Sequence, residues 1–301
     1  MNLKYIVKSN DNYINVKEVL KAYFKISDRL LLRLKNTKNI LLNGSPTYVS
    51  KEVKVNDEIT VIIDFVENSS NIVPTKMDLD ILYEDDCYLV INKSPNLPVH
   101  PSMSHYENSL SNGVKYYFDS IGLKKKIRPV NRLDKDTSGI VIFAKNEYIQ
   151  ECLVSQMKSK VFEKQYIAVC NGTFTEKSGT INLPIARKQG SIIERCVDST
   201  GDIAITHYEV IHEFDNISVV KCLLETGRTH QIRVHLSNIG HPILGDTLYG
   251  EKNTNISRQL LHAYKVKFVH PLTNEIVTYT APIPDDIDEF RDASKNIKHN
   301  N

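Results

Sequence analysis

Cysteine is scarce in this sequence, and its placement argues against several kinds of site. Only 5 of the 301 residues are cysteines, an odd and scattered set without a Cys-x-x-Cys pair. Such a set does not suggest a disulfide framework, and the missing pairs argue against a zinc ribbon. Cys170 and Cys222 lie in apolar, strand-like runs. We therefore expect reduced thiols, several of them buried in the core.

Long hydrophobic runs and a glycine-rich loop are missing as well. The run at residues 139–144 is typical of the longest apolar ones, whereas a bilayer span needs roughly 18 such residues. The first residues lead into no hydrophobic region of the kind found in signal peptides. No loop has the glycine spacing that cradles a nucleotide. From these absences we expect a cytoplasmic protein with no membrane partner and no cofactor.

Neither acidic nor basic residues dominate the chain, yet their distribution is uneven. The 38 Lys and Arg against 36 Asp and Glu give a net charge of +2. Residues 1–66 hold 11 basic and 7 acidic side chains, so this region carries +4 and the remainder −2. A basic region on a nearly neutral body favours an anionic polymer as partner. On charge alone, a solvated surface explains the same excess.

The composition and length indicate a folded protein of two domains. With 41% hydrophobic and 25% charged residues, the chain is unlike a disordered protein, a collagen-like fibre or a coiled coil. At ~150 residues per domain, the length predicts two domains. We place them at residues 1–66 and 81–290, joined by a polar linker at residues 67–80. Residues 285–301 are expected to fray, with residues 291–301 as the tail.

In the first domain, hydrophobic periodicity predicts two helices followed by a hairpin. The apolar residues of 14–36 repeat at helical spacing in two pieces, and Ser27 is placed to cap the second helix. Two short apolar runs, residues 40–42 and 47–49, flank an Asn-Gly turn, which is typical of a β-hairpin. A strand at residues 58–66 completes a small α/β module.

In the second domain, short strands outnumber helices. Helices are predicted at residues 108–119, 147–159 and 229–239. Strands are predicted at residues 81–83, 88–92, 139–144, 164–170, 203–211, 217–225, 265–269 and 276–280. Because regular alternation of strand and helix is absent, we predict an α+β fold with a mainly antiparallel mixed sheet.

Two polar segments carry residue types that catalysis needs. Residues 128–139 are dense in charged groups and run into an apolar strand, which makes a good platform for a fixed carboxylate. A surface ion pair between Arg132 and Asp134, or a simple turn, explains the same residues. Residues 225–235 place basic and amide side chains near a predicted helix start, where free N–H groups favour anions. The histidines of this region are spaced too widely for a short helical metal motif, so no metal site is predicted.

Together with residues 163–166 (Glu-Lys-Gln-Tyr), these segments resemble RNA pseudouridine synthases of the RluA/RluD type. In that family, His-Arg-Leu-Asp-x-x-Thr-Ser-Gly precedes an apolar strand, and Glu-Lys-x-Tyr and Gly-Arg-Thr-His-Gln-Ile-Arg-Val-His follow later. This sequence has all three in the same order, and the resemblance covers residues 80–282. It departs from the family at Asn131, where His is usual; the family does not rely on that His as a nucleophile. Shorter matching segments lie at residues 92–95, 99–102, 245–250 and 260–263.

The resemblance implies a pseudouridine synthase fold and an aspartate-dependent isomerisation of uridine in RNA. Asp134 would be the catalytic carboxylate, with Arg233 as the cation that orients it and lowers its pKa. Tyr166 would stack on a uracil flipped out of the RNA, and Arg132 would fill the gap that the base leaves. Whether Asp134 attacks C1′ of the ribose or removes the 2′ proton stays open.

Residues 14–63 resemble the small RNA-binding module shared with ribosomal protein S4, which has two helices followed by a hairpin. Four basic residues in the helical part are spaced four apart, which would align them on one continuous helix as an RNA-contacting patch. They are Lys21, Lys25, Arg29 and Arg33. A helix break near Ser27 would spoil this alignment.

Two other functions compete with catalysis on RNA. A non-catalytic RNA-binding or ribosome-assembly protein could keep the same fold, although it would not need Asp134, Tyr166 and Arg233 as a set. A glycoside hydrolase would need two carboxylates facing each other across a sugar, and Asp136 on the same loop as Asp134 gives no reason for that. We expect an enzyme that acts as a monomer on RNA, with large-subunit ribosomal RNA favoured and transfer RNA possible.

Overall fold

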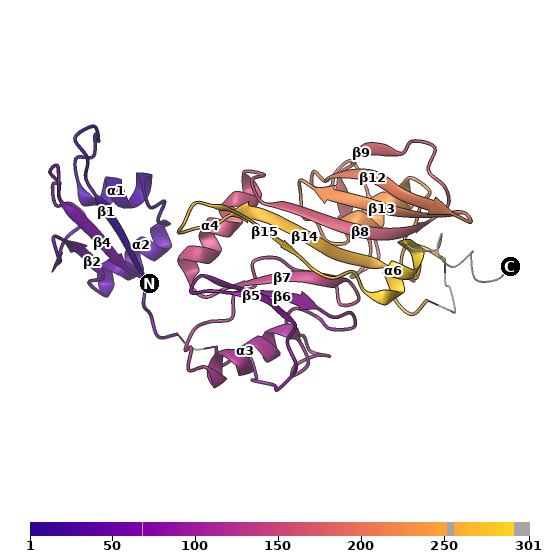
Figure 1. Cartoon of the computed structure of the whole chain (residues 1–301), viewed down its shortest axis with the longest axis horizontal. Helices are drawn as coiled ribbons and strands as arrows, with labels where there is room; N and C mark the ends of the chain where they lie inside the picture. Colours follow the sequence, from indigo (N-terminus) through magenta and orange to yellow (C-terminus); the bar gives the residue numbers. More distant parts are fainter. Residues whose placement is uncertain (68, 252–255, 292–301) are drawn as a thin grey trace.

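The N-terminal module is a small antiparallel sheet with two helices. In the computed structural model, which describes residues 1–67, 69–251 and 256–291, the strands of this sheet have the order β1-β4-β2-β3. The module lies at one end of the molecule (Figure 1). Its elements are β1 (Asn2–Ile6), α1 (Val16–Ala22), α2 (Asp28–Asn36), β2 (Ile40–Leu42), β3 (Ser45–Pro46) and β4 (Glu58–Ile62).

Local sequence explains most of this module. Ser27 caps α2 as predicted, because its hydroxyl accepts a hydrogen bond from the N–H of Leu30 at 3.2 Å. The hairpin forms as well, but its second strand is β3 and precedes the predicted residues 47–49. Strand β1 was not predicted. It has only five residues, and its partner strand β4 is more than fifty residues away in the sequence, so no local pattern indicates it.

The second unit is built on a mixed sheet that is mainly antiparallel, which confirms the predicted fold class. Among the described residues, the strand order is β5-β6-β7-β14-β8-β13-β12-β9, with β15 paired to β14. The pairing of β7 with β14 is parallel, and the other neighbours are antiparallel. The strands are β5 (Ile81–Glu84), β6 (Tyr88–Lys93), β7 (Ser138–Ala144), β8 (Glu163–Asn171), β9 (Ser178–Asn182), β12 (Ile205–Phe214), β13 (Ile217–Leu224), β14 (Leu261–Val269) and β15 (Ile276–Thr280).

Strands β6 and β7 are buried on both faces because a helix covers each side. Alternate residues of β6 and β7, such as Leu89 and Val141, pack with helix α3 (Leu110–Ser120). The intervening residues, such as Val90 and Ile142, belong to the cluster that includes helix α4 (Glu147–Lys158). Every residue of β7 is therefore buried, and the polar loop in front of it starts from a rigid base.

In the second unit, three short strands and one helix were not expected from the sequence. Strand β9 lengthens the sheet edge, while β10 (Ile185–Arg187) and β11 (Arg195–Val197) form a separate two-stranded hairpin. The expectation of fraying from residue 285 is wrong in part, because α6 (Asp285–Arg291) is a helix whose Ile287 is fully buried. The predicted tail beyond Arg291 lies outside the described residues. Among the described residues, no helix is long and apolar enough to cross a membrane.

The segment at residues 67–80, predicted as a linker, is held by both units. The Glu67 side chain is only 4% exposed and pairs with Arg33 of α2 and with Arg128. Farther along, the side chain of Asn112 in α3 donates to the carbonyl of Val73 at 2.8 Å. One hydrophobic cluster includes residues of both units, among them the core of the small module and Tyr148 of α4. The two units therefore share buried surface.

Candidate active site

The loop that carries Asp134 is fixed to strand β7 by the side chain of Asn131. This carboxamide accepts a hydrogen bond from the N–H of Ile142 and donates one to the carbonyl of Ile140, each at 2.9 Å. It therefore satisfies two backbone groups at the edge of the strand, as a neighbouring strand would. Asn131 occupies the position where the family motif usually has His, so the packing of this loop rests on the amide.

A buried lysine holds the same loop from its other side. Lys93, at the end of β6, is 1% exposed, and its Nζ donates to the carbonyls of Lys135 and Ser94 at 2.9 and 2.8 Å. Burial lowers the pKa of Lys93 to about 7. Gly139 has a φ of 107°, and a Cβ there would lie 2.3 Å from the carbonyl oxygen of Ala263. Only glycine lets β7 approach β14 this closely, so the loop is fixed before any substrate binds.

Arg233, in helix α5 (Gln231–Asn238), lies between two carboxylates. Its Nη1 donates to Asp134 Oδ2 at 2.9 Å, while Nε and Nη2 donate to the two oxygens of Asp246 at 2.7 and 2.8 Å. Desolvation opposes the charge of Arg233, but the hydrogen bonds with Asp246 and the charge of Asp134 outweigh it and raise its pKa. Asp246 is fully buried, whereas the Asp134 side chain remains 28% exposed. The guanidinium is thus permanently charged and directs one N–H at the accessible carboxylate.

His230 and Tyr249 extend this network. His230 Nε2 lies 3.7 Å from Asp134 Oδ2, and its Nδ1 lies 2.8 Å from the hydroxyl of Tyr249. The same hydroxyl accepts a hydrogen bond from the backbone N–H of Arg195, so its own proton is available to Nδ1. Burial lowers the pKa of His230, although the charge of Asp134 opposes this shift. A neutral ring with its proton on Nε2 fits these contacts.

A cavity of about 880 Å³ opens beside Asp134, which is large enough for a nucleotide. Tyr166 lines it from strand β8, and its side chain is 7% exposed. Burial and the negative charge of Asp134 raise the pKa of Tyr166, so its hydroxyl keeps the proton. Lys164, on the same strand, also lines the cavity, and burial lowers its pKa. The fold thus gathers Asp134, Tyr166 and Arg233 around one inner recess.

Arg132 lies at the mouth of this cavity. Its side chain is exposed and lines the cavity, the inner recess and a neighbouring hollow. In the part of the chain that the structure describes, no carboxylate pairs with Arg132. An exposed guanidinium at the mouth is suited to contact a polyanion.

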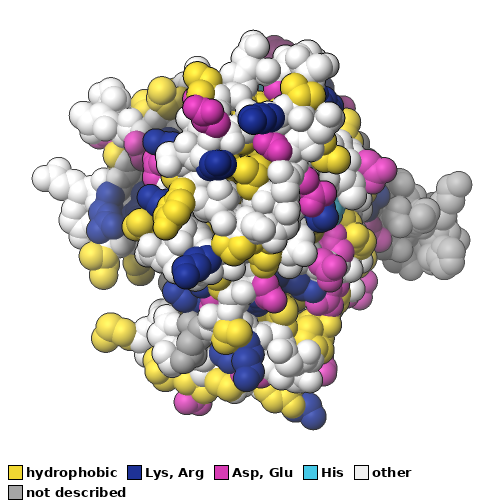
Figure 2. Space-filling model, turned by 90° about the vertical axis from the view of Figure 1, so that its left-hand side faces the viewer, with side chains coloured by type: hydrophobic (Ala, Val, Ile, Leu, Met, Phe, Trp, Pro, Cys, Tyr) yellow, Lys and Arg dark blue, Asp and Glu magenta, His cyan; other side chains and the backbone are white. Residues whose placement is uncertain are grey.

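The four basic residues of the N-terminal module do not lie on one helix. Helix α1 ends at Ala22, Lys25 has a φ of +55°, and α2 starts only at Asp28, so a spacing of four no longer aligns them. Lys21 pairs with Asp28 at 2.7 Å. In the end-on view of Figure 2, the Lys and Arg side chains are scattered over the surface. Lys25 and Arg29 are exposed.

Arg33 is paired with acidic side chains of the protein at a partly exposed position. Its Nη1 donates to Glu67 at 2.7 Å and to Glu147 of α4 at 2.8 Å, and its guanidinium lies 3.8 Å from the ring centre of Phe65. The α2 cap residue Ser27 adds a hydrogen bond to Glu151 at 2.7 Å. Arg33 therefore anchors the small module to the large one.

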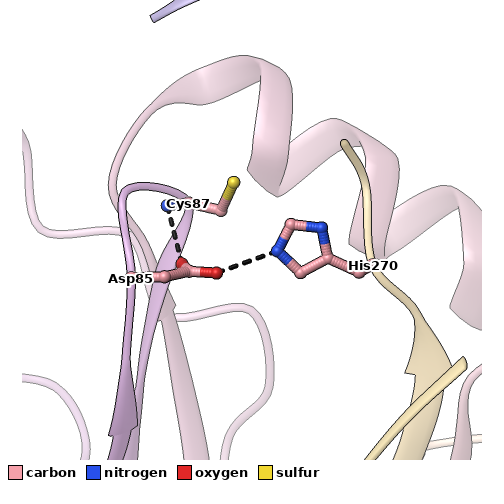
Figure 3. A group of neighbouring side chains, drawn as sticks. All are labelled: Asp85, Cys87 and His270. Carbon is pink, nitrogen blue, oxygen red and sulfur yellow. Dashed lines mark hydrogen bonds and ion pairs between the residues drawn. The ribbon is translucent and has the colours of Figure 1, made fainter. Parts of the chain in front are cut away.

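Three side chains of the types that bind metals converge elsewhere, at Asp85, Cys87 and His270 (Figure 3). His270 Nδ1 accepts hydrogen bonds from the N–H groups of Leu272 and Thr273, so the ring proton is on Nε2 and is donated to Asp85 at 2.8 Å. Burial raises the pKa of Cys87 to about 12, whereas a metal ligand would be a thiolate. These contacts make the group a brace between two turns.

The sequence pattern pointed to Asp134 and Arg233 as a pair but missed the further partners Asp246 and His230. Asp246 lies in a turn, where it accepts hydrogen bonds from the N–H groups of Leu248 and Tyr249. Its contact with Arg233 spans 13 positions and a loop, which no periodicity encodes. The signal that could have found it is the segment at residues 245–250, which matches the family motif.

Several known proteins are similar to this chain over most of its length. The family model described as RNA pseudouridylate synthase matches residues 87–238. The uncharacterised RNA pseudouridine synthase YjbO of Bacillus subtilis (strain 168) is 40% identical over 266 residues, covering 88% of this chain and 94% of that protein. The ribosomal large subunit pseudouridine synthase D of Haemophilus influenzae (strain ATCC 51907 / DSM 11121 / KW20 / Rd) is 36% identical, covering 85% and 83%. Human RNA pseudouridylate synthase domain containing 1 superposes with a TM-score of 0.57 at 26% identity, over 74% of this chain and 95% of that one.

Proposed function

This chain belongs to the family of RNA pseudouridine synthases, and we propose that Asp134 is the carboxylate that starts its reaction on a uridine of large-subunit ribosomal RNA. The observation that carries the assignment is the position of Asp134. It is partly exposed beside a nucleotide-sized cavity, and a buried arginine at 2.9 Å fixes its orientation. An ionised, oriented carboxylate next to a ribose is what cleavage of the glycosidic bond requires.

The reaction breaks the N1–C1′ bond of uridine and joins C1′ to C5 of the same uracil. The C5 proton leaves and N1 gains a proton, so atoms balance without any second substrate. The hydrogen bond from Arg233 orients Asp134, and the recess around Tyr166 retains the freed uracil. Asp134 acts either on C1′ directly or on the 2′ proton, and both routes start from the same carboxylate position.

Tyr166 and Arg132 take the roles that surround this chemistry. The ring of Tyr166 forms a wall of the cavity against which a flipped uracil stacks, and its protonated hydroxyl lies near the carboxylate. Arg132, exposed at the mouth, fills the space that the base leaves in the RNA. Flipping costs on the order of a few kcal/mol, which stacking and phosphate contacts offset.

The names of the relatives support large-subunit ribosomal RNA as the target. Several proteins that are 34–36% identical over most of this chain are named ribosomal large subunit pseudouridine synthase D. Transfer RNA is the second candidate target. In this proposal the enzyme is cytoplasmic. It acts as a monomer, since one chain supplies Asp134, Tyr166 and Arg233 to the cavity.

The N-terminal module serves as an S4-like RNA-binding domain in this proposal. Its two helices and hairpin support the assignment, as does the +4 charge of residues 1–66. Lys25 and Arg29 are the exposed members of the basic set, while Lys21 and Arg33 are paired within the protein. The module therefore contacts RNA through fewer of these residues than their spacing in the sequence predicted.

Replacement of Asp134 tests the function. Asp134→Asn keeps the size of the side chain but removes its charge, so we expect pseudouridine formation to be lost while RNA binding is largely retained. Pseudouridine mapping of total RNA from a deletion strain, complemented with wild type or mutant, measures both the activity and the target. Asp215→Asn, in the exposed turn between β12 and β13, is the matched control. Full modification by Asp134→Asn would refute the role of Asp134, and sites found only in transfer RNA would refute the ribosomal target.

A further inference from the structure

Beside the active site, a small hairpin and a loop enclose a second hollow of about 490 Å³. The hairpin consists of β10 and β11, and the loop covers residues 198–202. Ile185 and Asp202 exchange two backbone hydrogen bonds, at 2.9 and 3.0 Å, which pin this loop to β10. A Cβ on Gly201 would lie 2.4 Å from the carbonyl carbon of Ile185, so this close contact requires glycine.

Four arginines line the hollow, and they outnumber its carboxylates. They are Arg132, Arg187, Arg195 and Arg228, and Asp202 is the acidic residue among the lining side chains. Asp202 is exposed and pairs with Arg228 at 3.2 Å. Among the described residues, Arg187 is exposed and has no ion pair. The hollow therefore carries an excess of positive charge that the described part of the protein leaves without a partner.

The pairing of the hairpin brings two of these arginines together. Arg187 of β10 and Arg195 of β11 are directly opposite each other in the antiparallel register, so their side chains are on the same face. Like charges in this position destabilise a hairpin. The Arg195 side chain is held at the backbone, because its Nη1 donates to the carbonyls of Ile193 and Glu194 at 3.1 Å. An arrangement that costs stability in the free protein is favourable once an anion lies between the two guanidinium groups.

The hairpin is rigidly connected to the catalytic residues. The backbone N–H of Arg195 donates to the hydroxyl of Tyr249, which contacts His230 next to Asp134. On its other side, the hairpin packs on α5, where Ile185 and Val234 belong to one hydrophobic cluster. The arginines therefore keep a fixed position relative to Asp134.

We propose that this hollow, hereafter the arginine hollow, binds the sugar–phosphate backbone of the RNA strand next to the flipped uridine. It shares the wall formed by Arg132, Gly227, Arg228 and Thr229 with the catalytic cavity, so a strand that enters one continues into the other. Guanidinium groups match phosphate oxygens with paired N–H donors, and such contacts do not depend on base identity. The inference rests on the proposed function, since it assigns the backbone of that same RNA substrate to Arg187, Arg195 and Arg228.

Charge removal at Arg187 tests the arginine hollow. Unmodified large-subunit ribosomal RNA, transcribed in vitro, is titrated with full-length wild type, Arg187→Gln, Arg187→Lys and Arg291→Gln, each checked for folding by its thermal melting. We expect Arg187→Gln to weaken RNA binding about tenfold, because it removes a charged hydrogen bond to phosphate. Its dependence of log Kd on log salt should become shallower by about 0.7 for each phosphate that the variant no longer neutralises. In turnover assays KM should rise by a larger factor than kcat falls.

The two control variants separate the outcomes. Arg187→Lys keeps the charge but not the fork, and its binding should fall between wild type and Arg187→Gln. Arg291→Gln makes the same exchange at an exposed position on α6 and should bind as wild type does. Wild-type affinity and an unchanged salt slope in Arg187→Gln would overturn the arginine hollow. If wild type binds the transcript but forms no pseudouridine in it, the proposed target fails, while the salt slopes still decide the role of Arg187.

Discussion

Asp246 influences the active site through Arg233. Its two oxygens accept from Nε and Nη2 of the guanidinium, and Oδ1 also accepts from the N–H groups of Leu248 and Tyr249. A fully buried carboxylate is tolerated only when it is paired and hydrogen-bonded, and Asp246 meets both conditions. Asp246 is therefore a positioning residue that leaves Nη1 of Arg233 for Asp134.

Neutralising Asp246 should separate positioning from catalysis. In Asp246→Asn the side-chain size is kept, but Arg233 loses its buried counter-charge and is free to form a closer pair with Asp134. We expect kcat to fall with little change in KM, and stability to fall by roughly 3 kcal/mol. Steady-state kinetics and urea unfolding measure the two effects. A variant with wild-type kcat would show that Asp246 has only a structural role.

Asn131 departs from the family motif at a position that holds the loop in place. Its amide bonds to Ile140 and Ile142 of β7, so it supports the loop through two backbone groups. The departure concerns how the loop is held. The side chain of Asp134 itself is held by its hydrogen bond with Arg233.

At the scale of elements, α2 and α4 are joined by a buried charge network. Arg33 of α2 bonds to Glu147 at the first turn of α4 and to Glu67, and Glu67 also pairs with Arg128 through two hydrogen bonds. Desolvation opposes the charge of Glu67, but the hydrogen bonds from Arg128 and Arg33 outweigh it and lower its pKa to about 2. The network stabilises the contact between the two units as long as Glu67 is ionised.

The stability of this contact should decrease at acidic pH. Because the folded pKa of Glu67 lies below its unfolded value of 4.5, its contribution is complete above pH 4.5 and is lost as pH falls toward 2. Glu67→Gln should lower stability at pH 7 by roughly 3 kcal/mol and flatten the loss of stability over that acid range. Urea unfolding from pH 7 to pH 2 measures both effects. If the variant loses stability between pH 4.5 and pH 2 as steeply as wild type does, Glu67 is not the cause of that loss.

At the scale of the whole molecule, the near-zero net charge conceals two positive regions. One is the N-terminal module, with Lys25 and Arg29 exposed, and the other is the arginine hollow. The shared hydrophobic cluster makes removal of residues 1–66 a poor test of RNA binding, because it would expose apolar core of the catalytic unit. Charge-removing point substitutions on the intact chain avoid this problem.

We predict that the double variant Lys25→Gln with Arg29→Gln binds RNA more weakly and with a shallower salt dependence. Each phosphate that is no longer neutralised lowers the slope of log Kd against log salt by about 0.7 to 0.9. The control is Lys4→Gln with Lys54→Gln, which removes two exposed charges from the same module. Filter binding over a salt titration measures the slopes. Equal slopes for both double variants would show that Lys25 and Arg29 have no special role in RNA binding.

Local sequence was sufficient for most of the elements and for the chemistry of the motifs. Some patterns involve only a few neighbouring residues, so they can be recognised in the sequence. They are the Ser27 cap, the two-residue alternation in β6 and β7, and the helical spacing of α3 to α5. The short hairpin of β10 and β11 was missed, since its strands have only three residues each and depend on packing against α5. Helix α6 was missed as well, because acidic residues in its first turn look like those of a tail.

By itself, the sequence determined the fold class and the family, because these rest on residue types at fixed short spacings, and it predicted Asp134 as the carboxylate. Tertiary structure decided which groups meet. Arg33 bonds to Glu147, which lies 114 positions away, and Arg233 bonds to Asp246 across a loop, and neither contact was expected from the sequence. In the tertiary structure, the basic residues predicted to form one stripe take different roles: Arg33 joins the two units, while Lys25 and Arg29 are exposed. The fold also brings four arginines around one hollow. Such contacts depend on the path of the chain between distant elements, and spacing along the sequence contains no information about that path.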